Sequence, residues 1–239
     1  MRICKLRFID KRFGSKAKRL NQTNMIYELK KDLQELPTKE IYKKYLLGQQ
    51  VWYFSDYIND SNPSRKYDDL KHFISDKLDI HFNNIAIVGS AKTGISFNPA
   101  KKFKFFNSES DFDIVLVSPK HFDKLWNAYL EMFYKQVMIP EYESVSKSVF
   151  KKFISLKEPT QKHKDIKDWI KLVEPLVKDL QLFFGVERDI NYRIYSSWES
   201  VENYHYFGIN QFKNFVINNK EKEEAISELI ESLLTAKNT

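Results

Sequence analysis

The chain has 239 residues, of which 42% are hydrophobic, so it can bury the full core of one domain, alone or with a helical appendage. A single cysteine excludes a disulfide framework and a cysteine-rich zinc site, and the five histidines are too scattered for metal-ligand spacing. The net charge of +7 is concentrated in residues 1–20, where eight basic residues face one acidic residue, so the remainder is balanced.

The basic segment over residues 1–20 has two interpretations. Its positive charge could attract RNA or another polyanion through Coulomb attraction. Equally, it could be a solvated chain end without a partner. The same residues lack the apolar core of a signal peptide, and no later run reaches the roughly 18 apolar residues that a membrane span requires. We therefore expect a cytoplasmic protein without membrane contact.

Two helical regions are expected before the first strand. Residues 25–60 repeat apolar side chains at near-helical spacing, with a break after them at NDSNPS. A second helix is expected from about Ser64, where apolar residues recur with the i, i+3, i+4, i+7 rhythm of a packed face. We assign residues 1–80 to the basic segment and to helices that pack on the core.

Three segments have the pattern of strands. Residues 85–88 (IAIV) and 112–117 (FDIVLV) are nearly continuous apolar runs, as in strands that are buried on both faces. Residues 188–194 alternate between two faces, as a strand does. We expect these strands to be neighbours in one small mixed sheet flanked by helices, with helical additions at both ends, so the expected fold class is α+β.

Further helices are expected between and after these strands. Ser118 and Pro119 form an N-cap and first-turn pair, which predicts a helix behind the second strand. Residues 163–184 form an amphipathic helical pattern, although Pro175 should kink or split it.

The end of the chain is expected to be helical as well. Ser196 and Glu199 form a capping box, which predicts a helix that runs toward Asn218. A separate final helix is expected from about Lys220. The resulting division has a core domain over residues 81–218 and a terminal helix over 219–239.

The stretch after the first strand, VGSAKTGIS, is rich in glycine. A P-loop requires Lys followed by Ser or Thr directly after its second glycine, but Ile95 follows Gly94, so the spacing excludes a P-loop. A dinucleotide-binding fingerprint is excluded because the third glycine is missing. Gly89 instead lets the backbone approach a phosphate, Ser90 adds a hydroxyl donor, and a short helix near Ala91 would offer free N–H groups.

Polar residues around this turn and the second strand complete a candidate site. Lys92 and Thr93 are either solvent-facing loop residues or further phosphate contacts. Asp111 and Asp113 lie two residues apart, so they project to one face of a strand. Two carboxylates this close repel each other unless a cation lies between them, and Mg²⁺ that carries nucleotide phosphates prefers such oxygen ligands.

Together, VGSAKTGIS and ESDFDIVLV resemble the signature of the DNA polymerase beta-like nucleotidyltransferase superfamily, over roughly residues 85–195. The resemblance implies that the Gly-Ser turn holds the triphosphate of an incoming NTP and that the paired aspartates bind two Mg²⁺ ions. It also implies a third carboxylate on a later strand, which completes the metal site and helps to activate an acceptor hydroxyl.

Two features depart from the family pattern. The 22 positions from Gly89 to Asp111 include an insertion, FNPAKKFKFFN, which we expect to be an exposed hairpin or loop able to touch an acidic substrate. The third carboxylate position falls on Asn191 in INYRIY, and a neutral amide is a poor base. Asp189 lies one pleat earlier on the same face, about 6–7 Å away, and could replace it.

The expected catalytic and metal-binding residues are therefore Asp111, Asp113 and Asp189. Arg193, on the strand that follows Asp189, either meets a phosphate or pairs with Glu187 or Asp189, and we expect the pairing.

Two functions fit this resemblance. The first is an Mg²⁺-dependent enzyme that transfers a nucleoside monophosphate from an NTP to a hydroxyl group of RNA, protein or a small molecule. The second is a degenerate member that binds nucleotide or nucleic acid as a sensor or complex subunit. The superfamily includes toxin and antiphage members, so a role in bacterial antiviral defence is implied by analogy.

Overall fold

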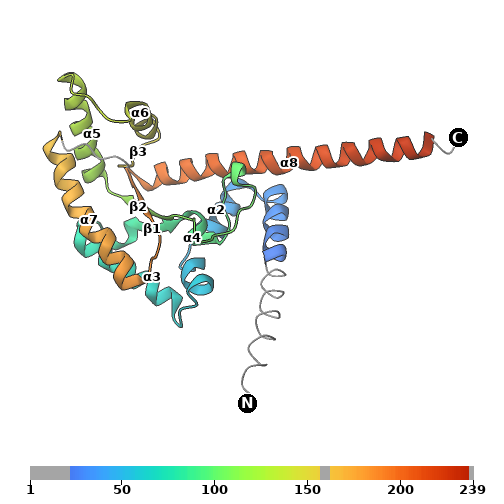
Figure 1. Cartoon of the computed structure of the whole chain (residues 1–239), viewed down its shortest axis with the longest axis horizontal. Helices are drawn as coiled ribbons and strands as arrows, with labels where there is room; N and C mark the ends of the chain where they lie inside the picture. Colours follow the sequence, from blue (N-terminus) through green and yellow to red (C-terminus); the bar gives the residue numbers. More distant parts are fainter. Residues whose placement is uncertain (1–21, 157–161, 237–239) are drawn as a thin grey trace, which may run out of the picture. The chain divides into compact units, whose positions relative to one another are not determined.

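The computed structural model describes residues 22–156 and 162–236, with side chains up to residue 220. The basic segment over residues 1–20 therefore lies outside the described residues. Helices surround a four-stranded mixed sheet, so the expected α+β class is confirmed (Figure 1). Tyr42–Gly208 form one compact unit that contains the whole sheet, and the other described residues form a second unit.

The structure has more elements than the sequence analysis expected. After a helix over residues 22–35, the elements in chain order are α2 (Thr38–Leu46), η1 (Tyr53–Tyr57), α3 (Pro63–Leu78), η2 (Phe82–Asn84), β1 (Ile85–Val88), α4 (Gly89–Thr93), η3 (Pro99–Lys101), β2 (Phe112–Val117), α5 (Pro119–Tyr134), α6 (Tyr142–Phe150), β3 (Phe153–Ile154), α7 (Lys164–Phe184), β4 (Ile190–Tyr195) and α8 (Trp198–Ala236). The expected helical region over residues 25–60 is thus interrupted around Pro37 and Gly48.

The sheet has the strand order β1-β2-β4-β3. β1 is antiparallel to β2, β2 is parallel to β4, and β3 is antiparallel to β4. The three expected strands are therefore neighbours in one mixed sheet, as predicted, and β3 is an unexpected edge strand. Because β1 runs against β2 and β4 runs with it, the end of β1 and the beginnings of β2 and β4 lie at the same end of the sheet.

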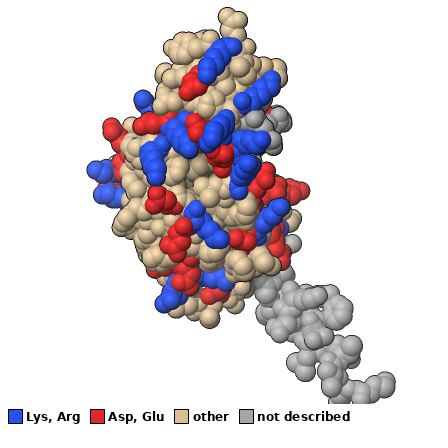
Figure 2. All heavy atoms as spheres, turned by 90° about the vertical axis from the view of Figure 1, so that its left-hand side faces the viewer, with Lys and Arg blue, Asp and Glu red and all other residues tan. Residues whose placement is uncertain are grey.

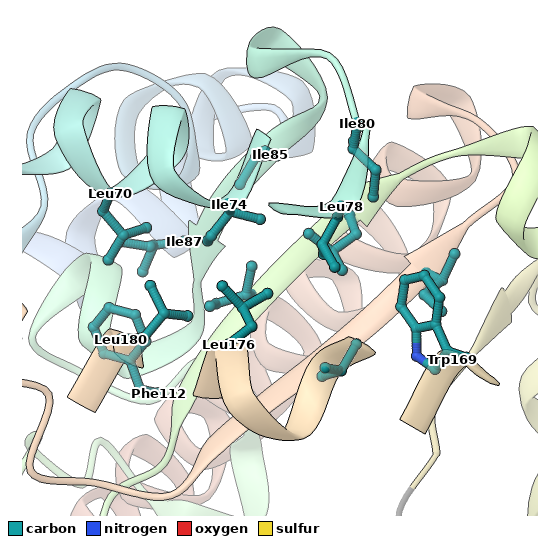
Figure 3. Packing of buried hydrophobic residues seen from close by; sticks show 14 of the residues in the cluster. Leu70, Ile74, Leu78, Ile80, Ile85, Ile87, Phe112, Trp169, Leu176 and Leu180 are labelled. Carbon is teal, nitrogen blue, oxygen red and sulfur yellow. The ribbon is translucent and has the colours of Figure 1, made fainter. Parts of the chain in front are cut away.

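One face of the sheet is covered by α3, α5 and α7. Figure 3 shows the part of this packing that α3 and α7 form. Leu70 and Ile74 of α3 and Leu176 of α7 face the side chains of Ile87 and Phe112. These side chains are almost completely buried. Each contributes about 1.5–3 kcal/mol relative to an exposed side chain, so this layer fixes the strands that carry the candidate site.

The opposite face of the sheet is covered by the first turns of α8. The apolar side chains that meet there are Val88, Val115, Val117, Phe153, Tyr195, Val201, Ala86, Trp198 and Tyr204. Since side chains alternate along a strand, Asp113 on β2 and Arg193 on β4 point to this same face. The polar residues of the candidate site therefore lie where the apolar packing under α8 ends.

Helix boundaries confirm part of the capping prediction and correct the rest. The Ser118 hydroxyl accepts a hydrogen bond from the His121 N–H at 3.4 Å, with Pro119 in the first turn of α5, as expected. For α8, the hydroxyl that accepts from the Ser200 N–H belongs to Ser197, at 3.2 Å, so the expected cap at Ser196 was one residue early.

Two expected interruptions are absent from the described helices. α7 continues through Pro175 as one helix from Lys164 to Phe184, so Pro175 does not split it. α8 runs without a break to Ala236, so the separate terminal helix expected from about Lys220 is wrong. No glycine or proline occurs after Gly208, which leaves no residue to end the helix.

The second unit consists of helical segments from both ends of the described chain. Leu29 and Leu33, in the helix over residues 22–35, are buried, as are Phe212 and Val216 in α8. The Lys213 ammonium donates a hydrogen bond to the Leu36 carbonyl. These contacts join the two segments, although they are far apart in the sequence.

The insertion between the two motifs folds back as an exposed hairpin-like loop, as expected. Ile95 and Phe105 form an isolated antiparallel bridge, and the Ser96 N–H donates to the Lys104 carbonyl at 2.9 Å. Phe106 is buried, which anchors the loop to the core.

Figure 2 shows blue and red side chains next to one another on the face that lies to the left in Figure 1. Ion pairs join neighbouring elements, as between Lys124 and Asp165 at 3.3 Å and between Lys77 and Asp179 at 3.7 Å. Such exposed pairs contribute at most about 1 kcal/mol each. Within the described ranges, no helix has the length and apolar character needed to cross a membrane.

Candidate functional site

The Gly-Ser turn and the second aspartate meet at one end of the sheet. Val88, the last residue of β1, is paired with Asp113. Gly89 follows with φ +69°, and a Cβ built on it would lie 2.7 Å from Oδ2 of Asp113. Glycine is therefore needed here for two reasons, because other residues rarely adopt this φ and because a side chain would collide with the carboxylate. Ser90 is partly exposed at the beginning of α4.

This contact gives a test of the turn. Gly89→Ala is expected to displace the Asp113 carboxylate and to weaken binding of Mg²⁺ with an NTP by at least roughly tenfold, a loss of about 1.4 kcal/mol. Gly185→Ala is a matched control, since Gly185 has φ +66° but no atom within 4 Å of an added Cβ. Calorimetric titration compares the two variants, and equal affinities would contradict the structural reason given for Gly89.

Asp113 has a fixed positive charge beside it. Nη2 of Arg193 lies 3.7 Å from Oδ1 of Asp113. The guanidinium lies near two aromatic rings, 5.8 Å from the centroid of Phe153 and 5.4 Å from that of Tyr204. Burial disfavours the charged guanidinium, but Asp113, Tyr204 and Tyr195 outweigh that effect and raise the pKa of Arg193. The expected pairing with Glu187 or Asp189 is thus corrected to Asp113.

Asn191 lies directly beside Asp113 on the neighbouring parallel strand. This is the position at which the resemblance calls for a third carboxylate. Its side chain is a neutral amide, which can accept and donate hydrogen bonds but carries no charge. On the same strand as Asn191, Arg193 pairs its guanidinium with Asp113.

The other two expected catalytic residues, Asp111 and Asp189, line one cavity. This cavity of about 240 Å³ is lined by Ser108, Glu109, Ser110, Asp111, Gln181, Glu187, Arg188 and Asp189. Asp111 and Asp189 are both exposed, and the Phe112 N–H donates to the Asp189 carbonyl at 2.9 Å. Asp111 and Asp189 thus line the same cavity, whereas Asp113 is not among its lining residues and packs against Gly89, so a metal site shared by all three stays a prediction.

The candidate site contains carboxylates, which are oxygen donors of the kind that Mg²⁺ prefers. Among the residues that the structure describes, no three His, Cys, Asp or Glu side chains gather closely enough to hold a metal ion. Mg²⁺ is commonly held by one or two carboxylates together with substrate phosphates. Asp111 and Asp113 can supply such carboxylates, and their role as ligands stays a prediction.

Lys92 and Thr93 lie in the interior. Lys92 is only 4% exposed, and its ammonium donates a hydrogen bond to the Gly48 carbonyl at 2.6 Å. The Thr93 hydroxyl lies 2.6 Å from the Ile95 carbonyl, to which it donates. Four residues are expected to bind a nucleotide. Gly89 and Ser90 lie at the end of β1, beside Asp113. The buried positions of Lys92 and Thr93 do not support a role in nucleotide binding.

Burial lowers the pKa of Lys92 to about 8, and the nearby ammonium of Lys71 adds to the effect. The ordinary pKa is higher, so between pH 8 and about 10.5 the folded protein binds fewer protons at this site than the unfolded chain. Below pH 8 the buried ammonium is charged and lowers the free energy of unfolding by its full amount. As the pH rises, Lys92 loses its proton and this destabilisation disappears. Relative to Lys92→Met, the wild type should gain about 3 kcal/mol of unfolding free energy over this range. Urea unfolding of both proteins at the two pH values measures this gain. A difference in unfolding free energy that does not change with pH would contradict the prediction.

Sequence and structure comparisons add no relative. No protein-family model, curated protein or solved structure matches this chain.

Proposed function

We propose that this chain is an Mg²⁺-dependent nucleotidyltransferase that moves a nucleoside monophosphate from an NTP to a hydroxyl acceptor. The observation that carries the proposal is the contact between Gly89 and Asp113. A phosphate held at the Gly-Ser turn would lie beside a carboxylate, and the two anions repel unless a cation lies between them. A turn suited to phosphate and a carboxylate suited to a cation are thus adjacent.

In this proposal each residue has a defined part. The Ser90 hydroxyl and the turn backbone hold phosphate oxygens. Asp111 and Asp113 would hold Mg²⁺, which supplies neutralisation of the phosphate charge. The acceptor hydroxyl oxygen attacks the α-phosphorus and forms a new P–O bond, its proton passes to Asp189, and pyrophosphate leaves with the electrons of the broken bond.

The test is transfer of label from an NTP with a radioactive α-phosphate. Total RNA, the protein itself and a panel of small hydroxyl compounds serve as acceptors, each with Mg²⁺ and with EDTA. The expected result is labelling of one acceptor class that depends on Mg²⁺ and is lost in Asp113→Asn. Labelling that persists in Asp113→Asn would contradict the proposed site.

A second candidate is a non-catalytic protein that binds nucleotide or nucleic acid as a sensor or complex subunit. The specific observations in its favour are that Asn191, a neutral amide, lies beside Asp113 where a third carboxylate is expected, and that the guanidinium of Arg193 lies 3.7 Å from Asp113. In that case no acceptor is labelled, and Asn191→Asp creates Mg²⁺ binding that the wild type lacks.

The basic segment over residues 1–20 stays a candidate for contact with RNA, and a role in antiviral defence stays a hypothesis from analogy.

A further inference from the structure

A second cavity, of about 200 Å³, lies at the free edge of β1, within the unit that contains the sheet. Its walls come from the end of α2, from α3 and from the first turns of α8, and they include the aromatic side chains of Tyr42, Tyr67 and Trp198. The Tyr67 hydroxyl accepts a hydrogen bond from the Ile87 N–H at 3.2 Å, which occupies part of the strand edge.

Lys71 is the one charged residue among the described residues that line this cavity. It is 4% exposed, and its ammonium lies 3.2 Å from Oδ1 of Asp68 and 3.5 Å from Oε1 of Gln49. The ammonium also lies 3.9 Å from the ring centroid of Phe82. The Asp68 side chain as a whole is 39% exposed, but its Oδ1, the oxygen that faces Lys71, is buried.

A second buried ammonium is close to the first. Lys92 is also 4% exposed, and its Nζ lies 5.6 Å from the Tyr67 ring centroid, while that of Lys71 lies 4.7 Å from the same ring. Two buried cations around one aromatic ring are costly, because burial removes their hydration and like charges repel. An anion in the cavity would offset part of this cost.

We propose that this cavity binds a small organic anion that carries an aromatic ring, such as a nucleoside monophosphate. The anionic group pairs with Lys71, and the ring packs against Tyr42 and Trp198. Aromatic walls with a few placed polar groups are typical of small-molecule sites. The inference does not depend on nucleotidyl transfer, because it uses neither the Gly-Ser turn nor the aspartates.

Leu47 provides a variant that leaves the core intact. It lines the cavity and is 43% exposed, so a charge placed there remains solvated. Leu47→Glu sets a negative charge at the cavity and Leu47→Lys a positive one, at the same position and similar size. Lys71→Met removes the ammonium and keeps the hydrocarbon stem.

The experiment is calorimetric titration of AMP into the full chain in EDTA, which removes the Mg²⁺ that the proposed transferase site needs. Adenosine and inorganic phosphate are titrated separately, to measure the ring and the anion alone. AMP should bind at least roughly tenfold more tightly than either fragment. Its affinity should fall at least roughly tenfold in Leu47→Glu and Lys71→Met, should be equal or tighter in Leu47→Lys, and should be unchanged in Asp113→Asn.

Three results would overturn the proposal. The first is no AMP binding at millimolar concentration by the wild type. The second is the same affinity in Leu47→Glu and Leu47→Lys, which would show that the charge at the cavity is irrelevant. The third is loss of AMP binding in Asp113→Asn with full binding in Lys71→Met, which would place AMP at the Gly-Ser turn. These titrations measure binding and need no catalysis. They therefore test the cavity even if the protein has no transferase activity.

Discussion

Asp113→Ala is expected to abolish the joint stabilisation of the protein by Mg²⁺ and an NTP. In the wild type each ligand completes the coordination of the other, so the two together should raise Tm more than the sum of their separate effects. At ligand concentrations near 100 times Kd, binding contributes about 2.7 kcal/mol, which corresponds to roughly 5–10 °C for a chain of this size. The variant should lose this shift because Asp113 is the carboxylate that contacts Gly89.

Thermal melting with Mg²⁺, with NTP and with both measures this effect. Asp113→Asn accompanies the alanine variant because it keeps the shape of the side chain beside Arg193. Asp123→Ala is the control, since Asp123 is an exposed carboxylate on α5 away from the turn. An undiminished joint shift in both Asp113 variants would exclude this carboxylate as a metal ligand.

The second large effect concerns the third carboxylate. Asp189→Asn should lower NTP-dependent labelling of an acceptor by at least roughly 10²-fold, the scale that follows loss of a general base. Nucleotide binding should survive, because in the proposal the Gly-Ser turn, Asp111 and Asp113 hold the nucleotide with its Mg²⁺, whereas Asp189 accepts the proton of the acceptor hydroxyl. Single-turnover labelling and nucleotide titration of the same preparation separate the two effects.

Glu187→Gln is the matched control for this prediction, because Glu187 is another exposed carboxylate that lines the same cavity. It should label like the wild type. Full activity of Asp189→Asn would refute the assignment of Asp189 while leaving the paired aspartates in place. No labelling by the wild type with any acceptor would favour the non-catalytic binder.

Much of the sheet and the meeting of the two motifs could be predicted from the sequence. The strands β1, β2 and β4 have apolar patterns that differ from the helical period, and β1 and β2 are bounded by turn residues. Gly89 and Asp113 lie at the end of one strand and the beginning of the next, so antiparallel pairing of these strands brings them together. Local patterns and one strand pairing are enough for this part of the fold.

Other features depend on contacts that one sequence does not reveal. β3 is only two residues long, which is too short for a period-2 pattern. The approach of Arg193 to Asp113 depends on the register between β2 and β4, which no local signal fixes. The burial of Lys92 depends on Gly48, a residue 44 positions earlier that supplies its carbonyl partner. These long-range contacts decide which polar residues of the site face a ligand.

The most direct test of the proposed site is a crystal structure with Mg²⁺ and a non-hydrolysable NTP, with Mn²⁺ as an anomalous-scattering replacement. We predict triphosphate oxygens within hydrogen-bond distance of the Gly89–Ser90 turn and a metal ion about 2.1 Å from a carboxylate oxygen of Asp113. A nucleotide bound elsewhere, with the ion pair between Asp113 and Arg193 intact and no metal at Asp113, would contradict the account.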